Sequence, residues 1–237
     1  MFRRENIAMV VAEFIGTFTL ASVVLAMIGR TSFPFFAAVA AGMTLGLMTL
    51  IIGNSSGAHL NPAVSIGLWW IRQLQAVKAL VFIVAQMLGG LVALTLNEYL
   101  LGDSLQSRAG DTFDAKVLVA EVVGTALFTF GVTAAISQGF QGLKRAVTVG
   151  GSLSLGIIVA TFASNGLLNP AVALGVQSWS WAYAGGPVAG ALVGVSLYTL
   201  LYAPRPARVV KATAKATKTT VNKVAKKAPA KKKTNRK

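Results

Sequence analysis

Long apolar segments alternate with short polar ones through the first 202 residues of the chain. A helix needs about 20 apolar residues to cross the hydrocarbon core of a bilayer. Segments of about this length predict six membrane-spanning helices, at about 6–29, 34–52, 77–101, 116–137, 146–163 and 180–202. Two shorter apolar segments, from 61 to about 70 and from 169 to about 177, follow the second and the fifth. At about 1.5 Å per residue each covers about half the bilayer, so we predict two re-entrant half-helices.

Both half-helices are expected to begin at an Asn-Pro-Ala triplet, Asn61-Pro62-Ala63 and Asn169-Pro170-Ala171. Asparagine is a favoured N-cap, and proline suits the first helical position because its nitrogen needs no hydrogen bond there. The backbone before each triplet, 54–60 and 164–168, is predicted to be non-helical. At membrane depth such backbone must face protein or a watery cavity. One triplet alone would be an ordinary helix start, and both asparagines could be caps and nothing more.

The two halves of the chain are related by a constant offset of 108 residues. The offset relates Asn61 to Asn169, and it also relates the Ala-Glu-x-x-Gly-Thr motif at Glu13 to the one at Glu121. An offset shared by separate motifs indicates an internal repeat. Each half holds three spans, an odd number, so the second half must be inverted in the membrane. The half-helices would then meet at the midplane with their positive N-terminal ends facing, which repels cations.

The doubled Asn-Pro-Ala and the doubled Ala-Glu-x-x-Gly-Thr resemble the aquaporin (major intrinsic protein) family, in the family's order. The resemblance covers about residues 6–202. It implies an all-α membrane protein of six transmembrane helices plus two re-entrant half-helices. Residues 1–202 would form a channel domain with inverted repeats at about 6–101 and 116–202. The resemblance also implies passive conduction of water and small uncharged solutes such as glycerol, no enzyme activity, and assembly as a homotetramer.

At the pore centre, the resemblance implies that the amide NH₂ groups of Asn61 and Asn169 donate hydrogen bonds to passing water. Their side-chain oxygens would cap the half-helices and leave the NH₂ free. Carbonyl groups of the preceding loops are expected to line the path as acceptors, because backbone at this depth cannot stay unpaired. These carbonyls belong to Gly57, Ala58 and His59 in the first loop and to Asn165, Gly166 and Leu167 in the second. We expect the His59 side chain to brace its loop, in preference to carrying protons or binding a ligand.

Glu13 and Glu121 lie inside predicted spans, where a carboxylate is a candidate functional group. In one hypothesis, implied by the resemblance, each carboxylate accepts hydrogen bonds from the N–H groups of a re-entrant loop and holds that loop in place. In the other, the carboxylates relay protons in a proton-coupled transporter of small solutes built on the same repeat. The repeat places one glutamate against each loop, and no intramembrane Lys or Arg accompanies them. Bracing is therefore the favoured hypothesis.

The sequence departs from the family pattern at Val172, directly after the second triplet. The resemblance places an arginine there, which narrows the pore mouth and donates to the solute. The other mouth positions, carried over by spacing, are Ala41, Ile157 and Gly166, and none has a polar side chain. We expect an apolar selectivity mouth, wider than that of a strict water channel and permissive to glycerol or urea. A constricted, nearly closed apolar mouth is the alternative.

Composition agrees with a membrane protein, since 54% of the 237 residues are hydrophobic and 12% are charged. The absence of cysteine excludes thiol catalysis and thiolate metal sites. With a single histidine, no metal site and no cofactor are predicted. Basic residues beside the predicted spans are concentrated on the side that holds both termini. The positive-inside rule therefore predicts a multi-pass protein of the cell membrane with both termini in the cytoplasm.

The segment 203–237 differs from the rest of the chain. It contains 13 of the 22 Lys and Arg residues and none of the 7 acidic ones, so it supplies most of the net charge of +15. Its low complexity and lack of an apolar face predict a disordered basic cytoplasmic tail. Anionic lipid headgroups are the expected partner. Nucleic acid is a less favoured one, because binding through phosphate charge alone is sensitive to salt.

Overall fold

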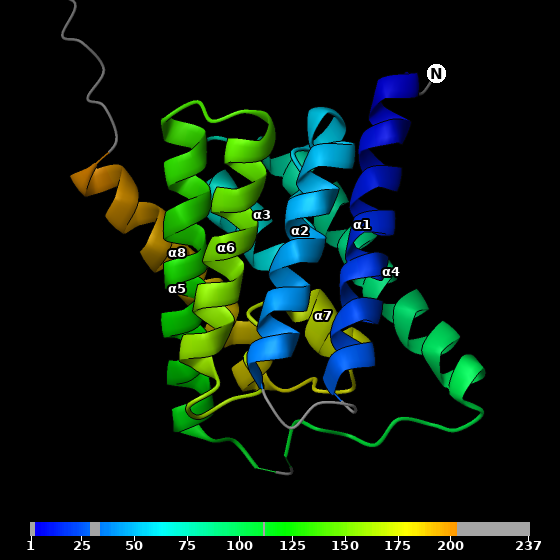
Figure 1. The fold of residues 1–237 in the computed structure, drawn as a ribbon. Helices are drawn as coiled ribbons and strands as arrows, with labels where there is room; N and C mark the ends of the chain where they lie inside the picture. Colours follow the sequence, from blue (N-terminus) through cyan, green and yellow to red (C-terminus); the bar gives the residue numbers. More distant parts are fainter. Residues whose placement is uncertain (1–2, 29–33, 111, 203–237) are drawn as a thin grey trace, which may run out of the picture. The chain divides into compact units, whose positions relative to one another are not determined.

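A computed structural model describes residues 3–28, 34–110 and 112–202 (Figure 1). The helices within these residues are α1 (Arg4–Ile28), α2 (Pro34–Ser56), α3 (Pro62–Trp70), α4 (Ala76–Leu101), α5 (Ala115–Ser137), α6 (Gly142–Ala160), α7 (Pro170–Gly175) and α8 (Trp181–Leu201). Six of them are long and apolar enough to cross a membrane, and α3 and α7 are the short ones. They belong to one compact unit that ends at Ala203. The predicted basic tail, 203–237, lies outside the described residues.

The helices form two copies of one arrangement. In the first copy α1 packs on α2 and α4, and in the second α5 packs on α6 and α8. The copies meet where α2 packs on α6, and where each short helix packs on the last helix of the other copy, α3 on α8 and α7 on α4. In Figure 1, α3 lies toward the end of the bundle at which α1 begins, and α7 lies toward the other end. The predicted all-α fold of six spans and two short helices is confirmed.

Some predicted boundaries are wrong. The first loop is shorter than 54–60, because α2 continues to Ser56, whose hydroxyl then accepts a hydrogen bond from the Ala58 N–H (3.0 Å). α7 ends before residue 177, because Gln177 is left-handed (φ 57°) and its carbonyl accepts from the Arg108 N–H (2.7 Å). α6 occupies 142–160 in place of the predicted 146–163. Hydrogen bonds in the loops accompany the first two boundaries, one within the first loop and one between Arg108 and Gln177, and an apolar pattern does not record such bonds.

Glycine permits several close helix crossings, and two of them join the two halves of the bundle. Where α2 crosses α6, a Cβ added to Gly42 or Gly150 would overlap the carbonyl oxygen of the other glycine. Where α4 meets α7, a Cβ on Gly90 would overlap the Ala171 carbonyl. Small residues allow helix backbones in membranes to approach this closely. The second contact holds the second triplet inside the bundle.

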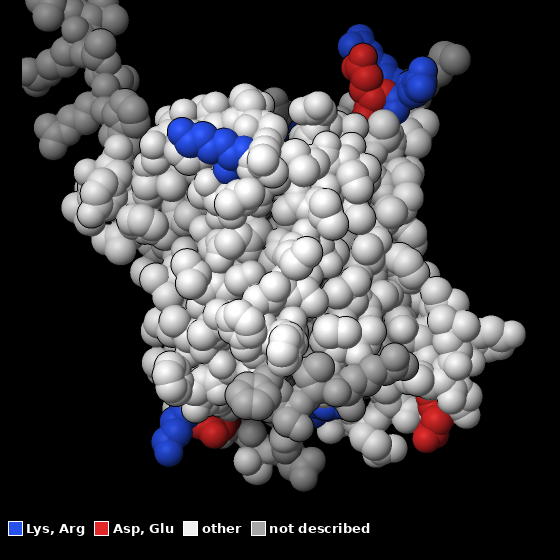
Figure 2. All heavy atoms as spheres, viewed as in Figure 1, with Lys and Arg blue, Asp and Glu red and all other residues white. Residues whose placement is uncertain are grey.

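The outside of the bundle is apolar. Large side chains such as Ile51, Leu80 and Leu155 are more than half exposed. On the face shown in Figure 2, the charged residues lie at the two ends of the bundle with an uncharged band between them. Buried carboxylates, those of Glu13 and Glu121, lie in the interior. An apolar exterior around buried polar groups is typical of a multi-pass membrane protein.

Gly150→Val should destabilise the bundle by about 1–3 kcal/mol or more, because the new side chain overlaps the backbone of α2. The measurement is the thermal midpoint of the purified protein in detergent, together with the fraction that elutes as a single species. Gly151→Val is the matched control, since a Cβ on Gly151 meets nothing within 4 Å. Equal losses in the two variants would contradict the close crossing.

Candidate functional site

Both short helices begin at the asparagines of the triplets. Asn61 has an extended backbone (φ −156°, ψ 120°), and its side-chain oxygen accepts from the Ala63 N–H (2.8 Å). Asn169 has nearly the same conformation (φ −153°, ψ 110°) and accepts from the N–H groups of Ala171 (3.0 Å) and Val172 (3.3 Å). In both helices proline occupies the first turn. The asparagines are therefore N-caps, as the sequence predicts.

The asparagines also join the two halves of the chain. The Asn61 amide donates to the Leu168 carbonyl and the Asn169 amide donates to the Leu60 carbonyl, each at 2.8 Å. The two helix starts therefore meet, and each amide keeps one of its two hydrogens for another acceptor. This corrects the expectation that the whole NH₂ group is free to donate into the pore. The acceptors of these bonds, Leu60 and Leu168, are missing from the predicted set of carbonyls.

The loops before the triplets follow the same unusual backbone path. Leu60 and Leu168 are both left-handed (φ 51° and 53°), and so are Ala58 and Gly166 at equivalent positions (φ 53° and 62°). Such a conformation costs a residue other than glycine roughly 1–3 kcal/mol and persists only where the surroundings enforce it. The Leu60 side chain packs against Gly16, and the Leu168 side chain packs against the repeat-equivalent Gly124. A side chain on either glycine would displace the leucine and with it the loop.

Glu13 and Glu121 supply the hydrogen bonds that these loops need. The Glu13 carboxylate accepts from the N–H groups of His59 (3.0 Å) and Leu60 (2.7 Å) and from the Gln86 amide (2.7 Å). The Glu121 carboxylate accepts from the N–H groups of Leu167 (3.0 Å) and Leu168 (2.7 Å) and from the Ser164 hydroxyl (2.8 Å). Both side chains are fully buried. Two consecutive loop N–H groups are therefore paired in each half.

Sequence reasoning missed the two side chains that complete these clusters. Gln86 lies fully buried in α4 and donates to both Glu13 and the Ser65 hydroxyl (3.0 Å). Ser164 donates to Glu121, and its oxygen accepts from the Gly166 N–H (2.9 Å), as Ser56 does from Ala58. The signal for Gln86 was present, because a long polar side chain inside an apolar span requires a buried partner.

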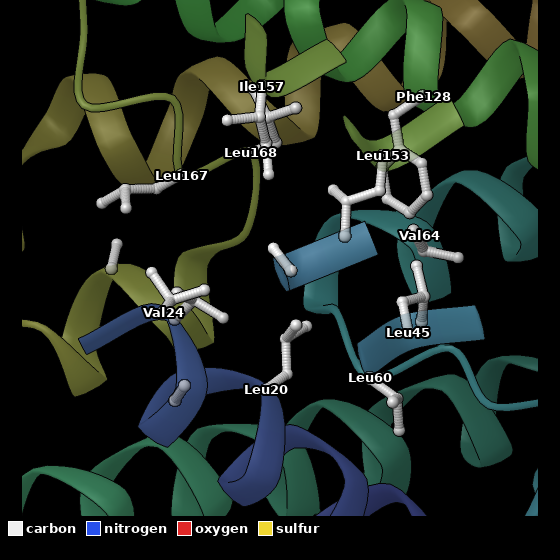
Figure 3. Packing of buried hydrophobic residues seen from close by; sticks show 14 of the residues in the cluster. Leu20, Val24, Leu45, Leu60, Val64, Phe128, Leu153, Ile157, Leu167 and Leu168 are labelled. Atoms are coloured by element: carbon white, nitrogen blue, oxygen red, sulfur yellow. The ribbon is translucent and has the colours of Figure 1, made fainter. Parts of the chain in front are cut away.

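Two small cavities lie on either side of the asparagine pair. The larger, which we name the Val172 cavity, has a volume of about 30 Å³. It is lined by all four predicted mouth residues, Ala41, Ile157, Gly166 and Val172, by the second-loop residues Asn165 and Leu167, by both asparagines, and by apolar side chains including Leu20, Val24, Leu45 and Leu153. Figure 3 shows Leu20, Val24, Leu153 and Ile157 converging on this interior from α1 and α6. Its volume is enough for about two water molecules, and the four predicted mouth residues together border this space.

The smaller, the Arg145 cavity, has a volume of about 10 Å³ and is lined by Gly57, Ala58, His59, Arg145 and Val149 among others. It has room for one water molecule at most. Leu45, His59 and Phe128 line both cavities and so lie between them. The predicted carbonyl-bearing residues of the first loop thus border one cavity, and those of the second loop border the other. The Gly57 carbonyl already accepts from Arg145 Nη2 (3.0 Å), a partner that the sequence does not predict.

The single histidine is packed inside the first half of the site. His59 Nδ1 lies 3.1 Å from the Ser65 hydroxyl, and the ring contacts Phe82 edge-on with centroids 5.3 Å apart. Among the described residues, no group of three or more His, Cys, Asp or Glu side chains could hold a metal ion. The chemistry available here consists of hydrogen bonding, steric selection and fixed charge.

Glu13→Gln should destabilise the protein, since the amide offers one acceptor where the carboxylate serves three donors, and its own NH₂ faces donors. The expected cost is about 1–3 kcal/mol for each buried donor left without a partner. It would be measured as a lowered thermal midpoint in detergent. Glu5→Gln, at an exposed position of the same helix, is the control and should leave the midpoint unchanged. A Glu13→Gln protein as stable as the parent would contradict the bracing role.

Comparisons with known proteins place this arrangement in a family. Residues 2–202 match the Major intrinsic protein family. Aquaporin Z of Photorhabdus laumondii is 28% identical over 228 residues, 82% of this chain and 97% of that protein. Probable aquaporin NIP7-1 of Arabidopsis thaliana is 30% identical over 210 residues, 80% of this chain and 74% of that protein. The solved structure of the aquaglyceroporin from Plasmodium falciparum is similar in fold, with a TM-score of 0.65 and 23% identity over 83% of this chain and 95% of that one. The chain therefore belongs to the major intrinsic protein family, and it is a membrane channel for water or small neutral solutes and not an enzyme.

Proposed function

We propose that this channel passively conducts water and small uncharged solutes such as glycerol, along a path that passes the Asn61 and Asn169 amides. The observation that carries the proposal is the pair of reciprocal 2.8 Å hydrogen bonds between the two triplets. They hold two helix N-termini together between the Val172 cavity and the Arg145 cavity. An aligned pair of donors with a water-sized space on each side suits a small molecule that accepts hydrogen bonds.

The asparagine pair also suits the exclusion of protons. A water molecule that accepts the remaining hydrogen of each amide turns its own hydrogens outward. The continuous chain of donors that proton hopping requires is then interrupted. Each helix start contributes a fraction of a positive charge, up to about half an elementary charge for a long helix, which repels cations at the same point.

The mouth at Val172 suits selection by size and polarity. An apolar lining supplies no hydrogen bonds to replace those that a solute loses on leaving water. Because the cavity holds about two water molecules, water fits there without any movement of the lining. A solute with a carbon skeleton, such as glycerol, requires side chains of the mouth to move apart.

The competing hypothesis is proton-coupled transport through Glu13 and Glu121. Within the described residues, every hydrogen-bond partner of Glu13 and Glu121 is a donor to the carboxylate. A proton relay would also need an acceptor to which the carboxylate could pass a proton. The bonds leave the carboxylates in the role of acceptors. Passive conduction is the simpler account of this geometry.

We further propose an orientation, an assembly state and a role for the tail. In Figure 1 the starts of α1, α4 and α6 lie at one end of the bundle, named here the N-terminal side, and the start of α5 lies at the other end. In the sequence, Arg3, Arg4, Arg72, Lys78, Lys144 and Arg145 lie at or just before the first three starts, whereas Arg108 and Lys116 flank the start of α5. Under the positive-inside rule the N-terminal side is cytoplasmic, in a cell membrane. The family resemblance favours a homotetramer with one pore per subunit. The basic segment 203–237 would bind anionic headgroups of the lipid bilayer.

Reconstituted vesicles test the proposed function directly. Stopped-flow light scattering should show faster osmotic shrinkage for vesicles with the protein than for empty ones, and re-swelling in glycerol should show whether glycerol enters. Conduction should not saturate with solute concentration and should not respond to a pH gradient. Flux that needs a pH gradient would favour the proton-coupled transporter, and shrinkage no faster than in empty vesicles would refute the channel.

Ile157→Ala should widen the mouth and raise the ratio of glycerol to water permeability several-fold, since Ile157 lines the Val172 cavity. Ile158→Ala is the matched control, because Ile158 is the adjacent residue of the same type and packs on the core without lining that cavity. Each variant loses buried apolar volume, at about 2–5 kcal/mol, so permeability is expressed per folded channel. Equal ratios in both variants and the parent would contradict the role of Ile157 in selection.

A further inference from the structure

Arg145 is a cation beside the pore to which the proposed function gives no role so far. It lies half-buried in the first turn of α6 and lines the Arg145 cavity with His59. Its Nη2 donates to the Gly57 carbonyl (3.0 Å), whereas its Nε is buried and has no hydrogen-bond partner within the described chain. A guanidinium carries five N–H donors in a fixed plane. The guanidinium borders a space of water size, and its charge acts on whatever occupies that space.

The position of Arg145 does not serve the stability of its helix. A cation in the first turn opposes the helix dipole, which favours anions there. Neither Asp nor Glu occupies the first turn of α6. Among the described residues no carboxylate pairs with Arg145, whose hydrogen bond goes to a backbone carbonyl. The bond to the Gly57 carbonyl offsets part of this cost and holds the guanidinium at the Arg145 cavity.

The backbone at Gly57 is shaped to hold the guanidinium there. Gly57 has a φ of 101°, a conformation that side-chain-bearing residues rarely adopt. A Cβ at Gly57 would lie 3.1 Å from His59 Nε2 and 3.8 Å from Arg145 Nη2. Glycine thus lets the imidazole approach the loop closely, whereas a Cβ would make only ordinary van der Waals contact with the guanidinium. The contact fixes the charge at one edge of the cavity.

The two mouths of the pore differ in charge. The offset of the repeat relates Arg145 to Ala37, which lines the Val172 cavity. No Lys, Arg, Asp or Glu is found among the described residues that line that cavity. The position after the second triplet, Val172, is apolar as well. The fixed positive charge of the lining therefore lies on the N-terminal side of the asparagine pair.

We propose that Arg145 is the cationic filter of this channel, an assignment that rests on the proposed passive channel. A cation entering the Arg145 cavity must lose most of its water and approach a guanidinium in a setting that screens charge weakly. A neutral molecule meets no such repulsion and gains a hydrogen-bond donor. Arg145 is thus a specificity-determining residue that excludes cations at the mouth opposite to the one that selects by size.

The test compares the parent protein with Arg145→Gln, Arg145→Lys and Lys144→Gln in proteoliposomes. Water permeability is measured by osmotic shrinkage and potassium permeability by a fluorescent indicator inside the vesicles. Arg145→Gln keeps a donor for the Gly57 carbonyl but removes the charge, so potassium permeability should rise on the order of tenfold. Arg145→Lys keeps the charge and should exclude potassium as the parent does. Lys144→Gln is the matched control, because Lys144 is exposed and lies over the Phe140 ring (3.7 Å from its centroid).

An Arg145→Gln channel that conducts water and still excludes potassium would overturn the proposal and leave Arg145 as a clamp for the loop. If that variant does not fold, Val149→Glu decides. Val149 lines the same cavity one turn along α6, so a glutamate there offsets the charge and leaves the bond to Gly57 in place. If potassium enters vesicles with Val149→Glu but not those with the uncharged control Val149→Gln, the result would support the filter. If both variants exclude potassium equally, the filter would be overturned. If the parent protein conducts no water, the proposed passive channel is refuted. If the parent conducts water, the potassium permeabilities of the variants decide whether Arg145 is the filter.

Discussion

Non-helical backbone at membrane depth must have all of its hydrogen bonds satisfied by protein, and this structure depends on how that is done. One buried carboxylate in each half accepts from two consecutive loop N–H groups: Glu13 accepts from His59 and Leu60, and Glu121 accepts from the equivalent pair. These bonds enforce the left-handed conformations at Leu60 and Leu168. The resulting backbone path places each asparagine at the start of its short helix, where its amide donates to a carbonyl of the opposite loop.

The interior is nearly symmetric, and the departures from symmetry lie at the mouths. Equivalent residues repeat the same contacts at the loops, from Ser56 and Ser164 to Asn61 and Asn169. Away from the centre the halves differ, since the cavity beside the first loop has Arg145 and the cavity beside the second has Val172. A symmetric centre treats a solute alike from both directions, so any difference between the two directions belongs to the two unequal mouths.

We propose that the two mouths select by different properties of the solute, because different side chains line them. A narrow apolar passage discriminates by size and by the cost of removing hydrogen bonds to water. A guanidinium discriminates by charge and offers donors to neutral molecules. The lining of the Val172 cavity holds no charged side chain among the described residues. In the Arg145 cavity the guanidinium instead has the Gly57 carbonyl as an acceptor.

The sequence by itself determined the spans, the repeat and the two helix starts, because each has a local cause. Apolar length predicts a membrane helix, and Asn-Pro predicts a cap wherever it occurs. The offset of 108 residues then paired Glu13 and Glu121 with their loops. What the tertiary structure decided depends on residues far apart in the chain: the 2.8 Å bonds across the asparagine pair, the hydrogen bonds of Gln86, the early end of α7 and the grouping of the four mouth residues around one cavity. Arg145 is the clearest case. In the sequence it is one more basic residue beside a span, and only the fold brings it to Gly57, 88 positions away.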